Sequence, residues 1–383
     1  MPRELIVSKV RYIFLIAAFN ALFFAILILQ KKKALHDKIL IYWLIYLGLY
    51  TGIYALFSNK LFIEFHLLSA SFISLLLLHG PFLFLYISAL IDQKFQFNKK
   101  KLLHFIPFIL FNLFIVIASF FPDLSERIRL DHVESEHGVP LLLNLFLILT
   151  VLSGPFYFIL SILLFKKLDI NIFNNFSSYE NVNLDWLRKL VYTFGVIWTI
   201  LMIIATVHHI FGMFSWIFCT HGLSLSLSVF IILIGYFGLK QKEIFIQHND
   251  QNIGYVTEPK PKYAGVVLKE ADAEKYISQI QHLMSLEKPY LDADLTLPQL
   301  STRLQIPSHL LSRVINENFG LNFFDFINQY RVDEVKSKLN NSEFDHLSIL
   351  GIAFECGFNS KSAFNRVFKK FTGLTPSEYK NQL

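Results

Sequence analysis

The sequence predicts an all-α protein, a seven-transmembrane-helix bundle followed by a cytoplasmic double helix-turn-helix domain. Three observations predict this fold class. The 383 residues are 54% hydrophobic and only 17% charged, whereas an average soluble protein carries about 25% charged residues. The apolar excess is confined to the part of the chain before Leu239. After Leu239 the composition is that of a soluble domain, and this part contains an internal repeat.

Seven apolar runs precede Leu239, and each has roughly the 18–25 residues that cross a bilayer as a helix. Buried helices of a large soluble protein are the alternative, but seven runs of this length favour membrane spans. The predicted spans are Tyr12–Leu29, Ile39–Phe57, Leu67–Ile91, Leu102–Phe121, Leu141–Phe165, Leu190–Phe211 and Trp216–Leu239, which together make residues 1–239 a membrane domain.

The positions of lysine and arginine predict the orientation of the bundle, because cytoplasmic loops are enriched in both residues. The first, third and fifth loops and the start of the tail are basic, whereas the loop 122–140 is acidic on balance. Arg3, Lys9 and Arg11 before the first span disagree with this orientation, but they are outweighed by the four basic segments. We therefore expect the N-terminus outside and the C-terminal domain in the cytoplasm.

The part after the last span divides into a linker, a connecting helix and a terminal domain. Residues 240–262 are polar, contain glycine and proline, and are predicted to be a linker. Within residues 263–290 we expect an amphipathic helix, Glu270–Glu287, that ends before Pro289 because the residue preceding a proline avoids helical geometry. Its apolar side either packs on the terminal domain, residues 291–383, or pairs with a second copy in a homodimer. The sequence leaves both open.

The terminal domain repeats itself at an offset of 53 residues, so that Arg313-Val314 matches Arg366-Val367. In each copy a glycine, Gly320 or Gly373, is placed to end a helix in the left-handed conformation. A polar residue follows as the cap of the next helix, with a carboxylate three positions on. The predicted helix pairs are Leu297–Leu304 with Ser308–Phe319, and Ser348–Cys356 with Lys361–Phe371, joined by a long helix, Phe323–Leu339.

The second helix of each pair has an apolar face for the core and a polar face for the outside. In a helix-turn-helix this helix enters the major groove of DNA. The outward residues, which we predict to contact DNA, are His309, Ser312, Arg313, Asn316, Lys361, Ser362, Asn365, Arg366, Lys369 and Lys370. Arginine can bind guanine, asparagine can bind adenine, and serine suits either base, whereas Lys369 and Lys370 are expected to hold phosphates. The alternative, a solvated surface of an ordinary helical bundle, is disfavoured by the two aligned arginines.

Residues from about Leu291 to Lys380 resemble the AraC/XylS family of bacterial transcription regulators. The signature is IAFECGFNSKSAFNRVFKKFTGLTPSEY, Ile352–Tyr379. The resemblance implies two helix-turn-helix units that read neighbouring major-groove segments, with Arg313 and Arg366 at positions that often contact bases. Gln305 departs from the family pattern at a turn position where glycine is common, and Pro307-Ser308 inverts the usual order. The membrane half resembles that of multi-pass regulators of this type, which implies the bacterial cytoplasmic membrane.

Two further patterns lie in the predicted spans and outer loops. Gly80-Pro81 and Gly154-Pro155 sit inside two spans that run in the same direction, where proline frees a backbone carbonyl. They form either a paired hinge or static kinks. His79 and His208 are ionisable groups within spans and are therefore functional candidates. The candidates for metal binding or proton sensing are His66, His132, His137, His208, His209 and His221, although none of them has a diagnostic spacing.

Taken together, these patterns predict a membrane-embedded, sequence-specific transcriptional regulator rather than an enzyme. Its expected partners are double-stranded DNA, the lipid bilayer and an unknown ligand or stress signal. No cofactor is expected, and the two cysteines, Cys219 and Cys356, indicate neither a disulfide framework nor a zinc site. The alternative is a transporter or intramembrane enzyme with an autoregulatory DNA-binding tail. A third hypothesis is that the linker is cut and the DNA-binding domain is released.

Overall fold

The structure is a computed structural model that describes residues 2–30, 34–56, 65–91, 95–128, 140–178, 184–211, 213, 216–240 and 270–383. The elements in these ranges are helices, which confirms the all-α prediction, and the described residues add one isolated bridge, between Phe176 and Thr296. The chain forms two compact units. The first comprises Met1–Phe165 and Leu184–Glu243, and the second comprises Lys166–Asn183 and Ile244–Leu383.

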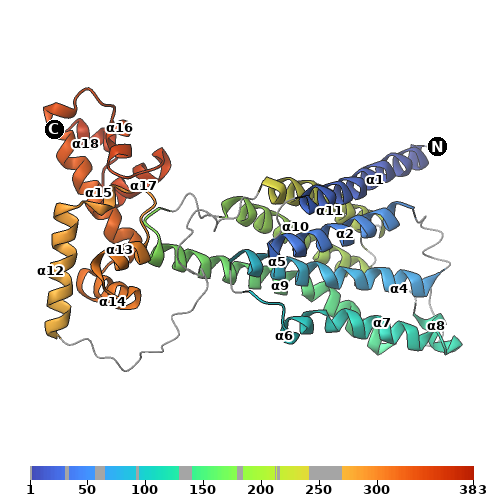
Figure 1. The fold of residues 1–383 in the computed structure, drawn as a ribbon. Coiled ribbons are helices and arrows are strands. Elements are labelled where there is room, and N and C mark those ends of the chain that lie inside the picture. Colours follow the sequence, from blue (N-terminus) through green and yellow to red (C-terminus); the bar gives the residue numbers. More distant parts are fainter. Residues whose placement is uncertain are drawn as a thin grey trace. The chain divides into compact units, whose positions relative to one another are not determined.

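The first unit is a bundle of apolar helices (Figure 1). Its elements are α1 (Pro2–Leu29), α2 (Leu35–Leu56), α4 (His66–Ser74), η1 (Leu75–Leu78), α5 (His79–Ile91), α6 (Lys99–Leu102), η2 (Leu103–Phe105), α7 (Ile106–Ala118), α8 (Pro122–Arg127), the first part of α9 (Leu141–Asn175), α10 (Asp185–Phe211) and α11 (Trp216–Lys240). Within the described residues, seven helical segments are long and apolar enough to cross a membrane, as the sequence predicted. Large side chains such as Phe19, Leu141 and Ile203 are more than half exposed on them.

The third apolar segment is continuous but not uniform. A 3₁₀ turn, η1, separates α4 from α5 just before Gly80-Pro81. The tighter winding leaves the Leu75 carbonyl for another donor, and the Tyr46 hydroxyl donates to it at 2.6 Å. The polar backbone group is thereby satisfied within an apolar surrounding, where an unpaired carbonyl would be costly.

The second unit holds α12 (Glu270–Leu286), η3 (Pro289–Leu291), α13 (Leu297–Leu304), α14 (Ser308–Phe319), α15 (Phe323–Leu339), η4 (Ser342–Phe344), α16 (Ile349–Glu355), α17 (Lys361–Thr372) and α18 (Pro376–Lys380). It has two cores, and α15 contributes to both. Phe326 and Ile327 face the core of α12–α14, whereas Val332 and Val335 face that of α16 and α17. Helix α12 buries Ile280 and Met284 in the first core, so its apolar side packs on its own domain.

Helix α9 does not end at Phe165, where the sequence analysis ended the fifth span, but continues to Asn175. Its last part belongs to the second unit. There the ring of Phe173 packs edge-on against Phe324 of α15, with 5.3 Å between ring centroids. Leu168, Ile172 and Phe176 are buried at a spacing of four residues. They form an apolar stripe on an otherwise polar extension, which makes this part of the helix amphipathic. This stripe explains why the helix runs on beyond the apolar run.

Candidate nucleic-acid interface

The first helix-turn-helix unit is α13 and α14. Thr296 and Gln299 form a capping box at the start of α13. The turn that follows places Gln305 at a φ of 56°, in the left-handed region, which explains why glycine is common at this position. Pro307 caps α14 with a φ of −54°. Leu311, Val314 and Ile315 are buried, which confirms the inward face of this helix.

The outward face of α14 carries the four predicted residues. His309 and Asn316 are exposed, and Ser312 and Arg313 are half-buried. Arg313 donates from Nε to the Glu317 carboxylate at 2.8 Å. Because both side chains are partly solvated, this i,i+4 pair contributes only about 0.3–0.5 kcal/mol. The pair therefore orients the guanidinium along the exposed face without locking it there.

The second unit is α16 and α17. Ser348 and Ser360 cap the two helices, with their hydroxyls accepting from the amides of Gly351 and Ala363 at 3.0 and 3.1 Å. Between the helices, Gly357 has a φ of 89°, and a Cβ there would lie 2.4 Å from the Tyr290 carbonyl oxygen. Glycine is therefore required at this turn both for its conformation and for a close approach.

The outward face of α17 is polar along its whole length. The six predicted residues are all exposed: Lys361, Ser362, Asn365, Arg366, Lys369 and Lys370. Lys369 and Lys370 at the end of α17 differ in their contacts. The ammonium group of Lys370 binds the carboxylate of the buried Asp325 at 2.7 Å and so connects α17 to the start of α15. Asp325 in turn belongs to the cap that Asn322 forms for α15.

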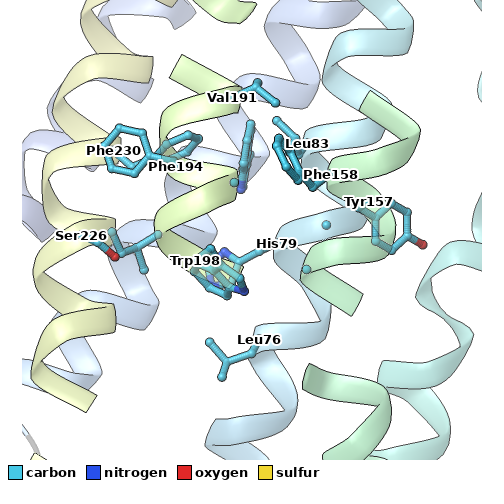
Figure 2. A pocket seen from close by; sticks show the side chains of 15 residues that line it. Leu76, His79, Leu83, Tyr157, Phe158, Val191, Phe194, Trp198, Ser226 and Phe230 are labelled. Atoms are coloured by element: carbon cyan, nitrogen blue, oxygen red, sulfur yellow. The ribbon is translucent and has the colours of Figure 1, made fainter. Parts of the chain in front are cut away.

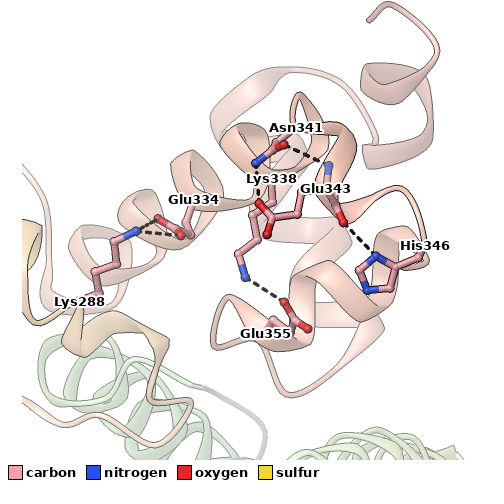
Figure 3. A network of polar contacts seen from close by, with 7 residues as sticks. All are labelled: Lys288, Glu334, Lys338, Asn341, Glu343, His346 and Glu355. Carbon is pink, nitrogen blue, oxygen red and sulfur yellow. Dashed lines mark hydrogen bonds and ion pairs between the residues drawn. The ribbon is translucent and has the colours of Figure 1, made fainter.

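Two ion pairs connect helix α15 to the residue before η3 and to α16 (Figure 3). On the side of the first unit, Glu334 accepts from Lys288 Nζ at 2.9 Å and from the Tyr290 hydroxyl at 3.0 Å. The neighbouring carboxylate adds to burial in raising the pKa of Tyr290. On the side of the second unit, Lys338 donates to Glu355 at 2.9 Å. Because these pairs are partly exposed, each contributes at most about 1 kcal/mol to holding α15 against its neighbours.

An arginine that the sequence analysis did not single out lies at the centre of this unit. Arg331 of α15 is 1% exposed. Its guanidinium donates to the carbonyl oxygens of Tyr290 and Asp292, each at 2.7 Å. Burial lowers the pKa of Arg331 to about 10, against the effect of Asp292 and Asp294. The group is still charged at neutral pH. A charged residue on the inward stripe of the predicted helix Phe323–Leu339 was the signal available for it.

Arg331 also binds the segment that follows α9, Phe176–Ser178, which we call the docking segment. Its Nη1 donates to the Ser177 carbonyl at 2.9 Å and its Nη2 donates to the Ser177 hydroxyl at 2.9 Å. Asn328 donates to the same carbonyl. The Ser177 amide donates to Leu295, beside the bridge of Phe176 to Thr296.

The docking segment contacts the second helix-turn-helix unit as well as the first. Asn359, in the turn before α17, donates to the Ser178 hydroxyl at 2.7 Å. The segment therefore contacts the start of α13, the middle of α15 and the turn that aims α17. No local sequence pattern announces these contacts, because the partners lie more than 100 positions away along the chain.

The structure brings the two predicted glycine–proline motifs to one place. Gly80, beside Pro81, and Gly154, beside Pro155, both line a cavity in the first unit. A Cβ at Gly80 would lie 2.2 Å from the ring of Tyr157, and one at Gly154 would lie 2.6 Å from that of Trp198. Each glycine thus allows an aromatic ring of another helix to pack against its backbone. A hinge at these motifs stays a prediction.

The predicted histidine candidates are only partly described. His66 lies 3.3 Å from the Ser125 hydroxyl. His132 and His137 lie outside the described residues, as do the side chains of His208, His209 and His221. Among the residues that the structure does describe, no three His, Cys, Asp or Glu side chains are grouped to hold a metal ion. The predicted linker also falls outside the described ranges, apart from Lys240 at the end of α11.

Comparisons with known proteins agree with this geometry. A family described as "Helix-turn-helix domain" matches residues 300–382. The HTH-type transcriptional regulator YtdP of Bacillus subtilis is 31% identical over 114 residues, which are 29% of this chain and 14% of YtdP. The HTH-type transcriptional regulator YijO of Escherichia coli is 28% identical over 109 residues, 27% of this chain and 38% of YijO. This chain therefore spans much less than two thirds of either relative.

Among solved structures, one similar chain is the C-terminal domain of the two-component response regulator yesN from Fusobacterium nucleatum. It is 33% identical, with 28% of this chain and 98% of that chain covered and a TM-score of 0.25. The family match covers α14 to α18 and most of α13. The C-terminal domain of this chain, in which α15 joins two helix-turn-helix units, is an AraC-type helix-turn-helix domain, of the kind that HTH-type transcriptional regulators carry.

Proposed function

We propose that the chain is a membrane-embedded, sequence-specific transcriptional regulator whose seven-helix unit senses a signal. The unit lies in the bacterial cytoplasmic membrane, with its N-terminus outside and the DNA-reading domain in the cytoplasm. Two observations support this placement. Seven apolar helical segments expose large side chains such as Phe19 and Ile203, a surface that lipid accommodates and water does not. The basic loops supply the orientation.

In this proposal α14 and α17 enter successive major grooves. Arg313 and Arg366 bind guanine, whereas Asn316 and Asn365 bind adenine, because their forked or paired polar atoms match those base edges. His309, Ser312 and Ser362 complete the base-facing surface. Lys361 and Lys369 hold phosphates. Lys370 orients α17 through Asp325 and contributes less to phosphate binding than its neighbour does.

The observation that carries the regulatory part is the continuity of α9. This one helix belongs to the apolar unit up to Phe165 and to the DNA-reading unit from Lys166 onward. Its end leads directly into the docking segment, which Arg331 and Asn359 bind. A signal that changes the state of α9 therefore acts on the residues that set the spacing and aim of the readers. A ligand produces such a change only if it binds two states of the bundle with different affinities.

The test is a genome-wide footprint of the intact protein in its host, compared with that of an Arg313→Ala/Arg366→Ala variant. We expect discrete sites for the wild type and their loss in the variant, because each arginine contributes about 1–3 kcal/mol of discrimination. Arg303→Ala, an exposed arginine outside both reader helices, serves as the matched control. Equal occupancy by the double variant would contradict the assignment of the readers.

Membrane placement is tested separately, by fractionating cells and fusing reporter proteins to each end. We expect the intact chain in the membrane fraction, an active cytoplasmic reporter at the C-terminus and an active external reporter at the N-terminus. A soluble full-length chain, or a C-terminal reporter active only outside the cytoplasm, would refute the placement. Recovery of a released C-terminal fragment would favour the hypothesis of cleavage in the linker.

A further inference from the structure

The apolar unit contains a partly open cavity of about 80 Å³, where five helical segments meet. Residues from α2, η1 with α5, α9, α10 and α11 line it. Figure 2 shows aromatic side chains around the space, with Phe158 on one wall and Phe194 and Phe230 on the opposite one.

The walls select for an uncharged and flat molecule. Aromatic rings surround the space, and aromatic pairs prefer offset-stacked or edge-to-face arrangements, both of which a planar ring system can make. The glycines widen this space, since Gly80 and Gly154 let the rings of Tyr157 and Trp198 lie against the helix backbone. Among the described residues, no lysine, arginine or carboxylate lines the cavity, so a charged ligand would lose its hydration without an opposing charge from them.

Two side chains of the cavity lining carry buried hydrogen-bond donors without partners. The indole nitrogens of Trp43 and Trp198 are buried and have no acceptor among the described residues. Trp43 is only 2% exposed. Trp198 packs edge-on against His79, with 5.1 Å between ring centroids (Figure 2). An indole N–H can only donate, so a ligand that satisfies either group must present an acceptor.

The remaining polar groups of the lining are already engaged. Nε2 of His79 lies 3.2 Å from the Tyr46 hydroxyl, which itself donates to Leu75. The Tyr157 hydroxyl points away from the cavity (Figure 2) and lies 2.9 Å from Nδ1 of His104. The hydroxyl of Ser226 donates to the Leu223 carbonyl in its own helix. A water molecule needs two to four polar partners, so the two indoles are better satisfied by a carbonyl oxygen.

We propose that this cavity binds a planar, uncharged aromatic carbonyl compound, whose rings stack on the aromatic walls and whose carbonyl accepts from an indole N–H. A fatty acyl chain would fill the space but leave both indoles unpaired. The idea that this ligand is the input of the sensor rests on the proposed function. Binding itself does not. The two are therefore measured separately.

Binding is tested on the full chain in lipid nanodiscs with tritiated 9-fluorenone and tritiated fluorene, which have the same ring skeleton but differ in the carbonyl. Binding to empty nanodiscs is subtracted. We expect saturable binding of fluorenone to one site, with fluorene about two- to tenfold weaker, as expected for loss of one hydrogen bond. Trp198→Phe or Trp43→Phe should weaken the binding of fluorenone by a similar factor and leave the affinity for fluorene unchanged. Trp186→Phe, which alters a tryptophan outside the lining, is the control.

A second pair of variants keeps the test decisive if a tryptophan variant fails to fold. Ser226→Trp places a large ring in the cavity and should abolish binding of both probes, whereas Leu225→Trp, at the neighbouring residue on the exposed face, should not. Equal affinity for fluorenone and fluorene, displacement of fluorenone by oleic acid alone, or binding that survives Ser226→Trp would each overturn the proposal.

The sensory role is read from the genomic footprint with and without fluorenone. A footprint that responds in the wild type but not in Ser226→Trp supports the cavity as the input. Saturable binding with an unchanged footprint refutes the sensory role and leaves the binding site intact. Absence of any specific footprint refutes the proposed function itself, whatever the binding assay gives.

Discussion

Replacement of Arg331 by methionine should detach the docking segment and destabilise the DNA-reading unit. The side chain makes five hydrogen bonds, to Tyr290, to Ser177 twice, to Asn328 and to Asp292. Methionine has a similar length, so the change removes the donors rather than opening a large void. The consequence therefore depends on the acceptors that lose their donors.

The acceptors differ in the hydrogen bonds that they keep after the substitution. The Ser177 carbonyl keeps the bond from Asn328, and the Asp292 carbonyl keeps the Leu295 amide at 3.3 Å. The Tyr290 carbonyl loses its bond to Arg331, and a buried acceptor left without a donor costs about 1–3 kcal/mol. Each lost bond from the charged guanidinium to Ser177 contributes about 1.5–3 kcal/mol, whereas removal of the buried charge recovers its desolvation cost, so the expected net destabilisation is about 3–5 kcal/mol.

Hydrogen exchange of the full chain in nanodiscs, followed by mass spectrometry, measures both effects. Peptides of α15 should report a lower opening free energy, and the Ser177 amide should lose most of its protection. Lys336→Met is the control, because this lysine pairs only with Asp333 at 3.4 Å on the surface of the same helix and should change stability by less than about 1 kcal/mol. If Arg331→Met behaves like the control, the network does not hold the segment and the argument fails.

Four other predictions concern turns, the lysine pair and the buried thiol. Gly357→Ala should lower the free energy of unfolding by about 3 kcal/mol or more, because alanine disfavours the positive φ and its Cβ would clash with the Tyr290 carbonyl. Gly373→Ala, with open space around its Cβ position, should lower it by only about 1 kcal/mol. Gln305→Gly should leave thermal stability unchanged or raise it by up to about 1 kcal/mol, and a clear loss would contradict strain at its φ of 56°. Lys369→Ala should lower DNA affinity and reduce the slope of log affinity against log salt concentration by about one. Lys370→Ala should mainly lower stability, because the side chain of the buried Asp325 loses its ion-pair partner and keeps the hydrogen bond from Asn322; equal effects on DNA affinity would refute this division. Burial raises the pKa of Cys356 to about 12 from an ordinary value of 9. Its thiol should therefore resist alkylation at pH 8, and its contribution to stability, complete below pH 9, should be lost as pH rises toward 12; rapid alkylation of the folded chain would disagree.

Local chemistry explains which parts of the DNA-reading domain could be predicted. The capping pairs Asn322–Asp325 and Thr375–Glu378 lie where the sequence placed them, since the two residues of such a pair are three positions apart. The bonds from Thr375 also lower the pKa of Glu378. Inward and outward faces of α14 and α17 followed from helical spacing alone. The seven apolar helical segments could likewise be recognised from local length and hydropathy.

The sequence by itself determined the helices, their caps and the two sets of outward-facing residues, because each depends on neighbours within a few positions. Only the tertiary structure decided that α12 packs on its own domain, that α9 extends into the second unit, and that Arg331 binds Ser177, 154 positions away. It also brought Gly80 and Gly154 to one cavity. These features depend on which distant surfaces meet in three dimensions. A stripe of apolar residues predicts that a face is covered, but many partners would satisfy it equally, and only the packed chain selects one.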